Sequence, residues 1–274
     1  MKQRVITKEI ITSINKWNAE IERLGDHHPW VTVRKVNKVG RRHLHKCQKQ
    51  KRIVHLLSDG EKRAYKILIW RPDTLKVEEQ YPLDINETLR IANELGYLHS
   101  GDYKKNAAHV MSTDFYSEHI DFVTGEIEKR AYNFKYWNQL WEFDSYGKLQ
   151  KKHYRVWQKI EIERRYWNER GVELFLISER DATKQICWNL DWFSTEANAY
   201  VCDNERFDFT QAFYDSWYDN KFLTTREHIV NAGSKLSLNF QRSQTIFKVV
   251  ALNRILKLDL TQRIFLRHPV KVQA

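Results

Sequence analysis

The first half of the chain alternates between helical and extended patterns of hydrophobic residues. Between Thr7 and Leu24, apolar residues recur three or four positions apart, which predicts an amphipathic helix that ends at Gly25. A serine before residue 59 and a proline at 72 bound a second helix. The predicted strands are residues 30–36, 52–57, 75–83, 109–116 and 127–137, and the other predicted helices are residues 58–70, 86–95 and 149–170.

The pattern changes after a short apolar run at residues 172–177, which predicts a buried strand. Helices mixed with strands up to this point predict an α/β domain over residues 1–178, with a mixed sheet flanked by helices. Residues 179–274 are predicted to form a small, mainly helical, winged-helix-like domain that ends in a β-hairpin. Its predicted helices are residues 182–192, 207–217, 224–231 and 236–253, and its predicted strands are residues 255–260 and 263–266.

Composition limits the classes of protein that fit this pattern. The chain of 274 residues carries a formal net charge of +11, which favours a polyanionic partner. No apolar run approaches the roughly 20 residues that cross a bilayer, and no signal-peptide pattern follows the start. Three scattered cysteines argue against a disulfide framework or a zinc ribbon. We therefore expect a soluble, cytoplasmic protein without a membrane partner.

Basic residues crowd one segment that contains no acid. A solvated loop and a nucleic-acid contact are both open interpretations of this segment, and the net charge favours the contact. The predicted DNA-binding residues are Arg34, Lys35, Lys38, Arg41, Arg42, Lys46, Lys49, Lys51 and Arg52.

Three residues could carry phosphodiester hydrolysis, which needs oxygen ligands for hard cations and a nearby ammonium. Asp114 is an acid inside an apolar strand pattern, where aspartate is a poor strand former. Asn133 and Lys135 are two positions apart on the next strand, so they share a face. If the two strands pair, Asp114 and Lys135 converge at one end of the sheet, and Glu61 comes from the helix that begins at Ser58.

Each of these residues also has a structural interpretation. Ser58 and Glu61 have the spacing of a capping box, so Glu61 could simply bind the backbone at the helix start. Asp114 could begin a turn. Lys135 could extend its aliphatic stem along Tyr136 and Trp137 towards water. Spacing alone leaves these alternatives open.

Several segments of the first domain, in order, resemble the TnsA family of endonuclease subunits from heteromeric transposon-seven-like elements. Together they make the resemblance specific, although each one alone is short. The segments are Pro29-Trp-Val-Thr-Val33, Gly40-Arg41, Val54-His-Leu-Leu-Ser-Asp59, Glu79-Gln-Tyr-Pro-Leu83, His109-Val-Met-Ser-Thr-Asp-Phe115, Glu161-Ile-Glu-Arg-Arg-Tyr-Trp167 and the strand to Ile177.

The resemblance implies a restriction-endonuclease-like core of the PD-(D/E)xK type. It assigns catalytic roles to Glu61, Asp114 and Lys135, and metal binding to Glu61, Asp114 and the backbone carbonyl of Asn133. Thr113 stands where the general signature has proline, and Asn133 stands where it has an acid. Glu163 is either an additional carboxylate near the site or, by helix spacing, one half of a surface charge pair.

The function that the resemblance implies is Mg²⁺-dependent cleavage of the non-transferred DNA strand at the 5′ ends of a transposon. Two Mg²⁺ ions per site are expected, and Mn²⁺ could substitute for them. The implied partners are double-stranded DNA at the transposon ends, a TnsB-type transposase, and a TnsC-type AAA+ regulator that docks on the C-terminal domain. The alternatives are a stand-alone restriction or repair nuclease and a non-catalytic DNA-binding adaptor.

Overall fold

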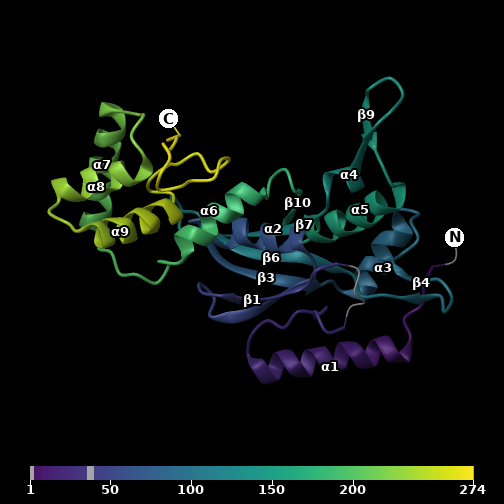
Figure 1. The fold of residues 1–274 in the computed structure, drawn as a ribbon. Helices are drawn as coiled ribbons and strands as arrows, with labels where there is room; N and C mark the ends of the chain where they lie inside the picture. The colour runs from purple at the N-terminus through teal and green to yellow at the C-terminus, as the bar shows by residue number, and fades with distance from the viewer. Residues whose placement is uncertain (1–2, 36–39, 274) are drawn as a thin grey trace. The chain divides into compact units, whose positions relative to one another are not determined.

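The computed structural model describes residues 3–35 and 40–273, which divide into two compact units (Figure 1). The first unit contains residues 1–46, 53–65 and 73–181. The second contains residues 182–274 together with two short segments from early in the chain, 47–52 and 66–72. The sequence did not predict that these two segments join the C-terminal part.

A four-stranded mixed sheet forms the centre of the first unit. The strands β3 (Thr74–Pro82), β6 (Ser112–Ile120), β7 (Ile127–Phe134) and β10 (Glu173–Ile177) lie in the order β10-β7-β6-β3. Strands β3, β6 and β7 pair antiparallel, and β10 pairs parallel with β7. The helices α2 (Asp59–Ile69), α3 (Ile85–Glu94) and α5 (Tyr154–Asn168) accompany this sheet. The prediction of an α/β domain with a mixed sheet and flanking helices is confirmed.

Aromatic rings join the helices of the first unit to the sheet. The ring of Trp167 on α5 stacks on Tyr116 of β6, with centroids 5.5 Å apart. On α2, the ring of Tyr65 lies 6.1 Å from that of Phe115. All four side chains are buried, so these contacts fix both helices against the two residues of β6 that directly follow Asp114.

Other elements of the first unit depart from the predictions. The predicted helix over residues 149–170 is wrong at its start, because residues 141–151 form a hairpin of β8 (Trp141–Phe143) and β9 (Leu149–Lys151) that follows the short helix α4 (Trp137–Leu140). The described part of residues 30–36 forms turns instead of a strand. The remaining elements are α1 (Lys8–Leu24), β1 (His43–Cys47), β2 (Arg52–Leu56), β4 (Gly101–Asp102) and β5 (Ala107–Ala108).

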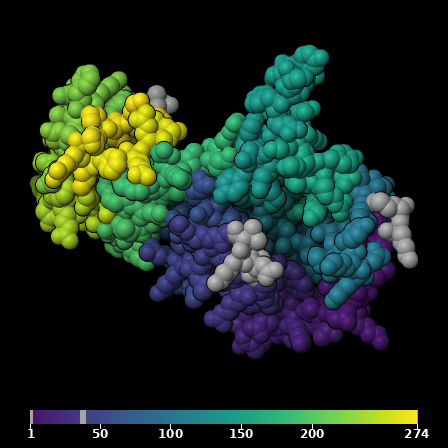
Figure 2. Space-filling model, turned by 45° about the vertical axis from the view of Figure 1, so that its right-hand side comes forward, coloured from purple at the N-terminus to yellow at the C-terminus, as the bar shows by residue number. Residues whose placement is uncertain are grey.

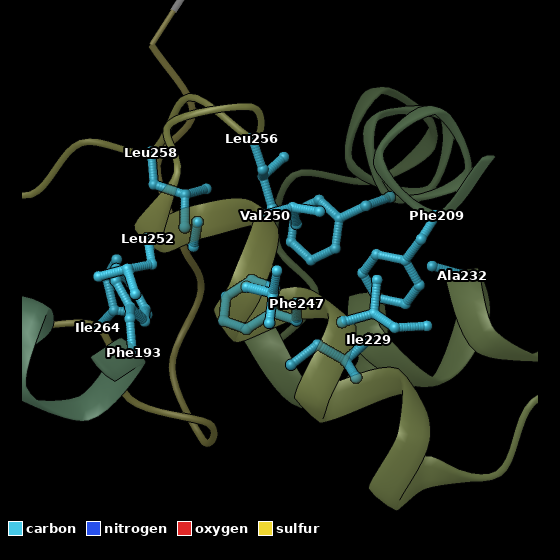
Figure 3. Close-up of a cluster of buried hydrophobic side chains, with 14 of the residues drawn as sticks. Phe193, Phe209, Ile229, Ala232, Phe247, Val250, Leu252, Leu256, Leu258 and Ile264 are labelled. Atoms are coloured by element: carbon cyan, nitrogen blue, oxygen red, sulfur yellow. The ribbon is translucent and has the colours of Figure 1, made fainter. Parts of the chain in front are cut away.

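Four helices enclose the core of the second unit: α6 (Lys184–Ser194), α7 (Asp203–Asp219), α8 (Thr225–Lys235) and α9 (Phe240–Leu252). Figure 3 shows Phe193, Phe209 and Phe247 pointing into this core from three of them. The two predicted C-terminal strands do not form; isolated bridges join Leu258 to Val272 and Thr224 to Pro269 instead. The winged-helix assignment therefore stays a prediction.

A search of the described residues for a helix of the length and apolarity that a bilayer crossing requires finds none.

Close contact between α2 and β7 depends on a glycine. A Cβ atom built on Gly60 would lie 1.9 Å from the Phe134 ring, far inside van der Waals contact. Phe134 directly precedes Lys135. A glycine in the first turn of α2 thus lets the helix bring its N-terminus up to the end of β7.

We expect Gly60→Ala to destabilise the protein by about 1–3 kcal/mol, because the added methyl group displaces a buried ring. In an open helix the same change would stabilise by up to about 1 kcal/mol, so the clash reverses its sign. Urea denaturation measures the difference. Gly40→Ala is the control, since no atom of the described residues lies within 4 Å of its added Cβ. A neutral or stabilising result for Gly60→Ala would contradict the close packing.

Candidate active site

Strands β6 and β7 bring Asp114 and Lys135 together at one end of the sheet. The Lys135 ammonium lies 3.3 Å from Asp114 Oδ2, and the backbone N–H of Phe134 donates to the same oxygen at 2.7 Å. The Asp114 N–H in turn donates to Asn133 Oδ1 at 2.9 Å. The side chains of Asp114 and Lys135 are 15% and 31% exposed, so this pair is partly open to solvent. The predicted convergence of the two strands is present in the structure.

Glu61 lies in the first turn of α2 and is held from several sides. Its carboxylate accepts hydrogen bonds from the Leu57 N–H at 2.8 Å and from the Ser58 hydroxyl at 3.2 Å. The Ser58 hydroxyl accepts from the Glu61 N–H at 3.0 Å. The local cap therefore exists, although Leu57 and not Ser58 supplies the backbone donor. Although Glu61 takes part in this cap, the charges of Asp114 and Lys135 still act on its carboxyl group.

The charges of both Asp114 and Lys135 affect the pKa of the Glu61 carboxyl group. Burial and, after it, the negative charge of Asp114 raise the Glu61 pKa to about 7, against smaller opposing effects of the Leu57 N–H and the Lys135 charge. Burial lowers the Lys135 pKa, but the carboxylates of Asp114, Glu163 and Glu61 outweigh it and raise that pKa above its ordinary value. The four charged groups are therefore close enough to one another to affect the pKa values of Glu61 and Lys135.

Glu163 is a buried carboxyl on α5, directly behind the pair. It is 8% exposed, and its Oε2 accepts from Asn133 Nδ2 at 2.7 Å and from the Thr113 hydroxyl at 3.3 Å. Burial raises its pKa to about 7, with the Asn133 hydrogen bond opposing. The interpretation of Glu163 as half of a surface charge pair is wrong, because its carboxyl group is inside the unit.

Two positions that the sequence did not single out as site residues support this arrangement. Gln80 on β3 is buried and has a left-handed φ of 49°. Its amide donates to Glu61 Oε2 at 3.3 Å and accepts from the Ser112 hydroxyl at 3.3 Å. Thr113, at the proline position of the signature, accepts from Trp167 Nε1 at 2.8 Å. The sequence marks Thr113 only as a departure from the signature proline, and nothing in the local pattern of β3 points to a role for Gln80.

The basic segment lies partly beside the start of α2. Arg41 and His43 approach the Asp59 carboxylate at 4.0 and 2.7 Å, and the His43 hydrogen bond is the main cause of the lowered Asp59 pKa. Arg42 donates to the Val33 carbonyl. Of the other predicted DNA-binding residues, Arg34, Lys35 and Lys46 are exposed in the first unit; Lys49, Lys51 and the half-buried Arg52 belong to the second; Lys38 lies outside the described residues.

Besides Arg41, which approaches Asp59, other residues of this basic set have structural contacts of their own. Arg42 ties the segment to Val33, and the Lys49 ammonium donates to the Ile69 carbonyl at 3.3 Å. The exposed members are better placed for contact with a polyanion. The segment's DNA-binding role stays a prediction.

The oxygen atoms of the site suit a hard divalent cation. Among residues 3–35 and 40–273, no group of three His, Cys, Asp or Glu side chains has the arrangement of a metal cluster. Mg²⁺ needs fewer protein ligands, since it keeps several waters and binds through one or two carboxylates. Burial and, after it, the negative charge of Asp114 raise the Glu61 pKa, so a cation held by these residues would offset both the burial and the repulsion of the ionised carboxylates.

Backbone oxygen is also present at the pair. The Phe134 carbonyl accepts from the Lys135 ammonium at 2.9 Å. The side chain of Asn133 is directed to Asp114 N–H and Glu163, so any contribution of this residue to a cation would come from its main chain. That assignment stays a prediction.

Comparison with known proteins places this site in context. Residues 71–179 match the model of a TnsA-like endonuclease N-terminal domain, a range that includes Asp114, Lys135 and Glu163 but not Glu61. The chain is also 32% identical over 167 residues to the transposon Tn7 transposition protein TnsA of Escherichia coli. That alignment covers 61% of this chain and 55% of the E. coli protein, so the chain matches about half of its relative's length.

We expect Glu163→Gln to stabilise the metal-free protein at pH 8.5 by about 1–3 kcal/mol. The folded-state pKa of Glu163 is above its ordinary value, so its contribution to stability is complete below about 4.5 and is lost as pH rises through about 7. Glutamine is never ionised and retains an acceptor for Thr113 and Asn133. The gain should vanish near pH 4.5.

Urea denaturation at both pH values measures this difference. The matched control is Glu161→Gln, two residues away on α5, whose half-exposed carboxylate pairs with Arg164 at 2.7 Å. It should show no stabilisation at pH 8.5. If Glu163→Gln changed the free energy of unfolding equally at the two pH values, ionisation of this carboxyl group would not be the cause of the destabilisation.

Proposed function

We propose that the chain is a metal-dependent DNA endonuclease of a transposase complex, because residues 71–179 match the model of a TnsA-like endonuclease N-terminal domain and the chain is similar to a transposition protein. Its reaction is proposed to be hydrolysis of the non-transferred strand at the 5′ ends of a transposon during cut-and-paste transposition. The observation that carries the proposal is the Asp114–Lys135 pair at 3.3 Å, with Glu61 electrostatically coupled to both.

Each side chain of the site has a role that follows from its contacts. Asp114 and Glu61 would hold Mg²⁺, which when bound activates a water molecule and stabilises the charge on the leaving oxygen. The Lys135 ammonium neutralises charge that develops on the attacked phosphate and orients the nucleophile. Its hydrogen bonds to Asp114 and to the Phe134 carbonyl keep it pointed at the site before DNA arrives.

Duplex DNA is the proposed substrate because the chain is strongly basic and the exposed Arg41 lies beside the start of α2. Contacts to phosphate position a protein on DNA without selecting a sequence. We therefore propose that a TnsB-type transposase selects the ends, and that a TnsC-type AAA+ regulator docks on the second unit. A bacterial cytoplasmic protein that joins the nucleoid when active fits these partners.

The direct test is cleavage of labelled transposon-end DNA by the purified chain, its partner transposase and Mg²⁺. We expect Asp114→Asn to abolish 5′-end cleavage, because the amide removes a charged ligand and the partner of Lys135. In calorimetry of the protein without DNA, the same variant should lose the Mg²⁺ binding event of the parent. Glu126→Gln, an exposed residue in the β6–β7 turn, is the control and should retain both.

The outcomes separate the alternatives. Cleavage by Asp114→Asn at the parent rate would overturn the assignment of the site. Sequence-specific cleavage by the parent without its partner transposase would point to a stand-alone nuclease. If the parent does not cleave DNA and its Mg²⁺ titration is the same as that of Asp114→Asn, the chain would be a non-catalytic DNA-binding adaptor.

Gln80 gives an independent prediction about the second carboxylate. We expect Gln80→Ala to lower the rate of cleavage about 10–100-fold, the usual effect of removing a residue that orients a metal ligand. Alanine keeps the backbone non-glycine at the left-handed position, so the change is confined to the side chain that donates to Glu61. Lys76→Ala, at the other end of β3, should leave the rate unchanged. Equal rates for all three proteins would show that Glu61 needs no support from β3.

A further inference from the structure

A projecting β-hairpin beside the site has no part in the chemistry above. It consists of β8 (Trp141–Phe143), β9 (Leu149–Lys151) and the turn between them. We infer that this hairpin is an arm that enters the major groove of the duplex next to the scissile phosphate. The inference rests on the proposed nuclease function, since it needs DNA at the Asp114–Lys135 pair.

Chain connectivity places the base of the arm at the site. The short helix α4 begins two residues after Lys135 and leads into β8, while β9 leads into α5, which carries Glu163. Figures 1 and 2 show the hairpin extending out of the first unit, well clear of the rest of its surface. A duplex whose phosphate is at Lys135 must therefore pass close to the root of the hairpin.

The base of the hairpin is firmly attached to α5. The indole of Trp157 donates to the Leu140 carbonyl at 3.0 Å and packs against the Trp141 ring, 4.9 Å between centroids. The Lys152 N–H donates to the same carbonyl at 2.9 Å, so both strands are tied at one point. The Trp137 N–H is bound by the Glu179 carboxylate at 2.8 Å. These contacts fix the direction of the arm before DNA binds. Binding therefore costs little conformational entropy.

The turn at the tip is also preorganised. The Asp144 carboxylate accepts from the backbone N–H groups of Tyr146 and Lys148 at 2.9 and 2.8 Å, and Gly147 takes a φ of 75° that a side chain would resist. Asp144 is therefore occupied with the turn. The exposed groups at the tip are the Tyr146 ring, 93% exposed, the Lys148 ammonium, and the cross-strand pair Phe143 and Leu149, 62% and 44% exposed.

The chemistry of the arm matches a DNA groove. A two-stranded ribbon has the width that the major groove admits. Neither the Lys148 nor the Lys152 ammonium has an ion pair among the described residues, so both are available to phosphates along the groove walls. Tyr146 supplies a ring and a hydroxyl at the depth of the base edges.

The test is methylation protection of guanine N7, an atom that lies in the major groove, in complexes of transposon-end DNA with the partner transposase. The protein is the cleavage-deficient Asp114→Asn chain, with and without Tyr146→Ala plus Lys148→Ala. We expect protected guanines beside the cleavage position to become reactive in the arm variant. In the active chain, the same two changes should lower cleavage about tenfold at physiological salt and reduce the salt dependence of binding by about one unit of slope.

The matched control is Tyr103→Ala plus Lys104→Ala, which removes an exposed tyrosine and lysine from the β4–β5 turn of the same unit. It should leave protection, cleavage and salt slope unchanged, and thermal denaturation should show that both double variants fold. Restored slope in Tyr146→Ala plus Lys148→Arg would support a phosphate contact.

Two results would overturn the inference while leaving the nuclease intact. One is unchanged protection and cleavage in the arm variant. The other is loss of transposase binding with the DNA footprint and salt slope preserved, which would make the arm a protein contact. An inactive parent chain would instead count against the proposed function, so the two failures are distinguishable.

Discussion

Three carboxyl groups and one ammonium lie where β6 begins and β7 ends, and the rest of the first unit is arranged around this excess of negative charge. The Lys135 ammonium pairs with Asp114, yet it must also offset the charges of Glu61 and Glu163. With the two glutamate pKa values near 7, each is only partly ionised at neutral pH. A site of this kind is electrostatically incomplete by itself. A divalent cation held there would supply the missing positive charge, and the approach of a negatively charged phosphate would increase the need for it.

Asn133 shows why an amide suits the position at which the general nuclease signature has an acid. Its oxygen accepts from the Asp114 N–H and its nitrogen donates to Glu163. A carboxylate could not make both bonds, since it has no hydrogen to donate, and it would place another negative charge against a buried one. The departure from the signature is thus coupled to the burial of Glu163 on α5. Trp167, one turn further along that helix, secures the arrangement through Thr113.

Periodicity was sufficient for the elements that carry this site. Alternating and apolar runs predicted β3, β6, β7 and β10 closely enough to pair Asp114 with Lys135, because sheet register follows the burial of one face. The burial of Glu163 was missed because Glu-Arg-Arg on a helix has the pattern of a solvated surface. The role of Gln80 was not predicted because the neighbouring sequence contains no signal for a residue of left-handed φ inside a strand. Both depend on packing between segments far apart in the sequence.

The hairpin of β8 and β9 illustrates the opposite failure, in which a local pattern misleads. Apolar spacing from Leu149 runs smoothly into the true helix at Tyr154, so periodicity extends the helix backwards over a strand. The turn residues Asp144 and Gly147 lie just before that run, and their effect is visible only once the Asp144 carboxylate is seen to bind the turn. Core positions are predictable because burial repeats at a fixed period. A projecting arm has no core to impose one, so its shape follows from a few hydrogen bonds and from the anchor that Trp157 provides at its base.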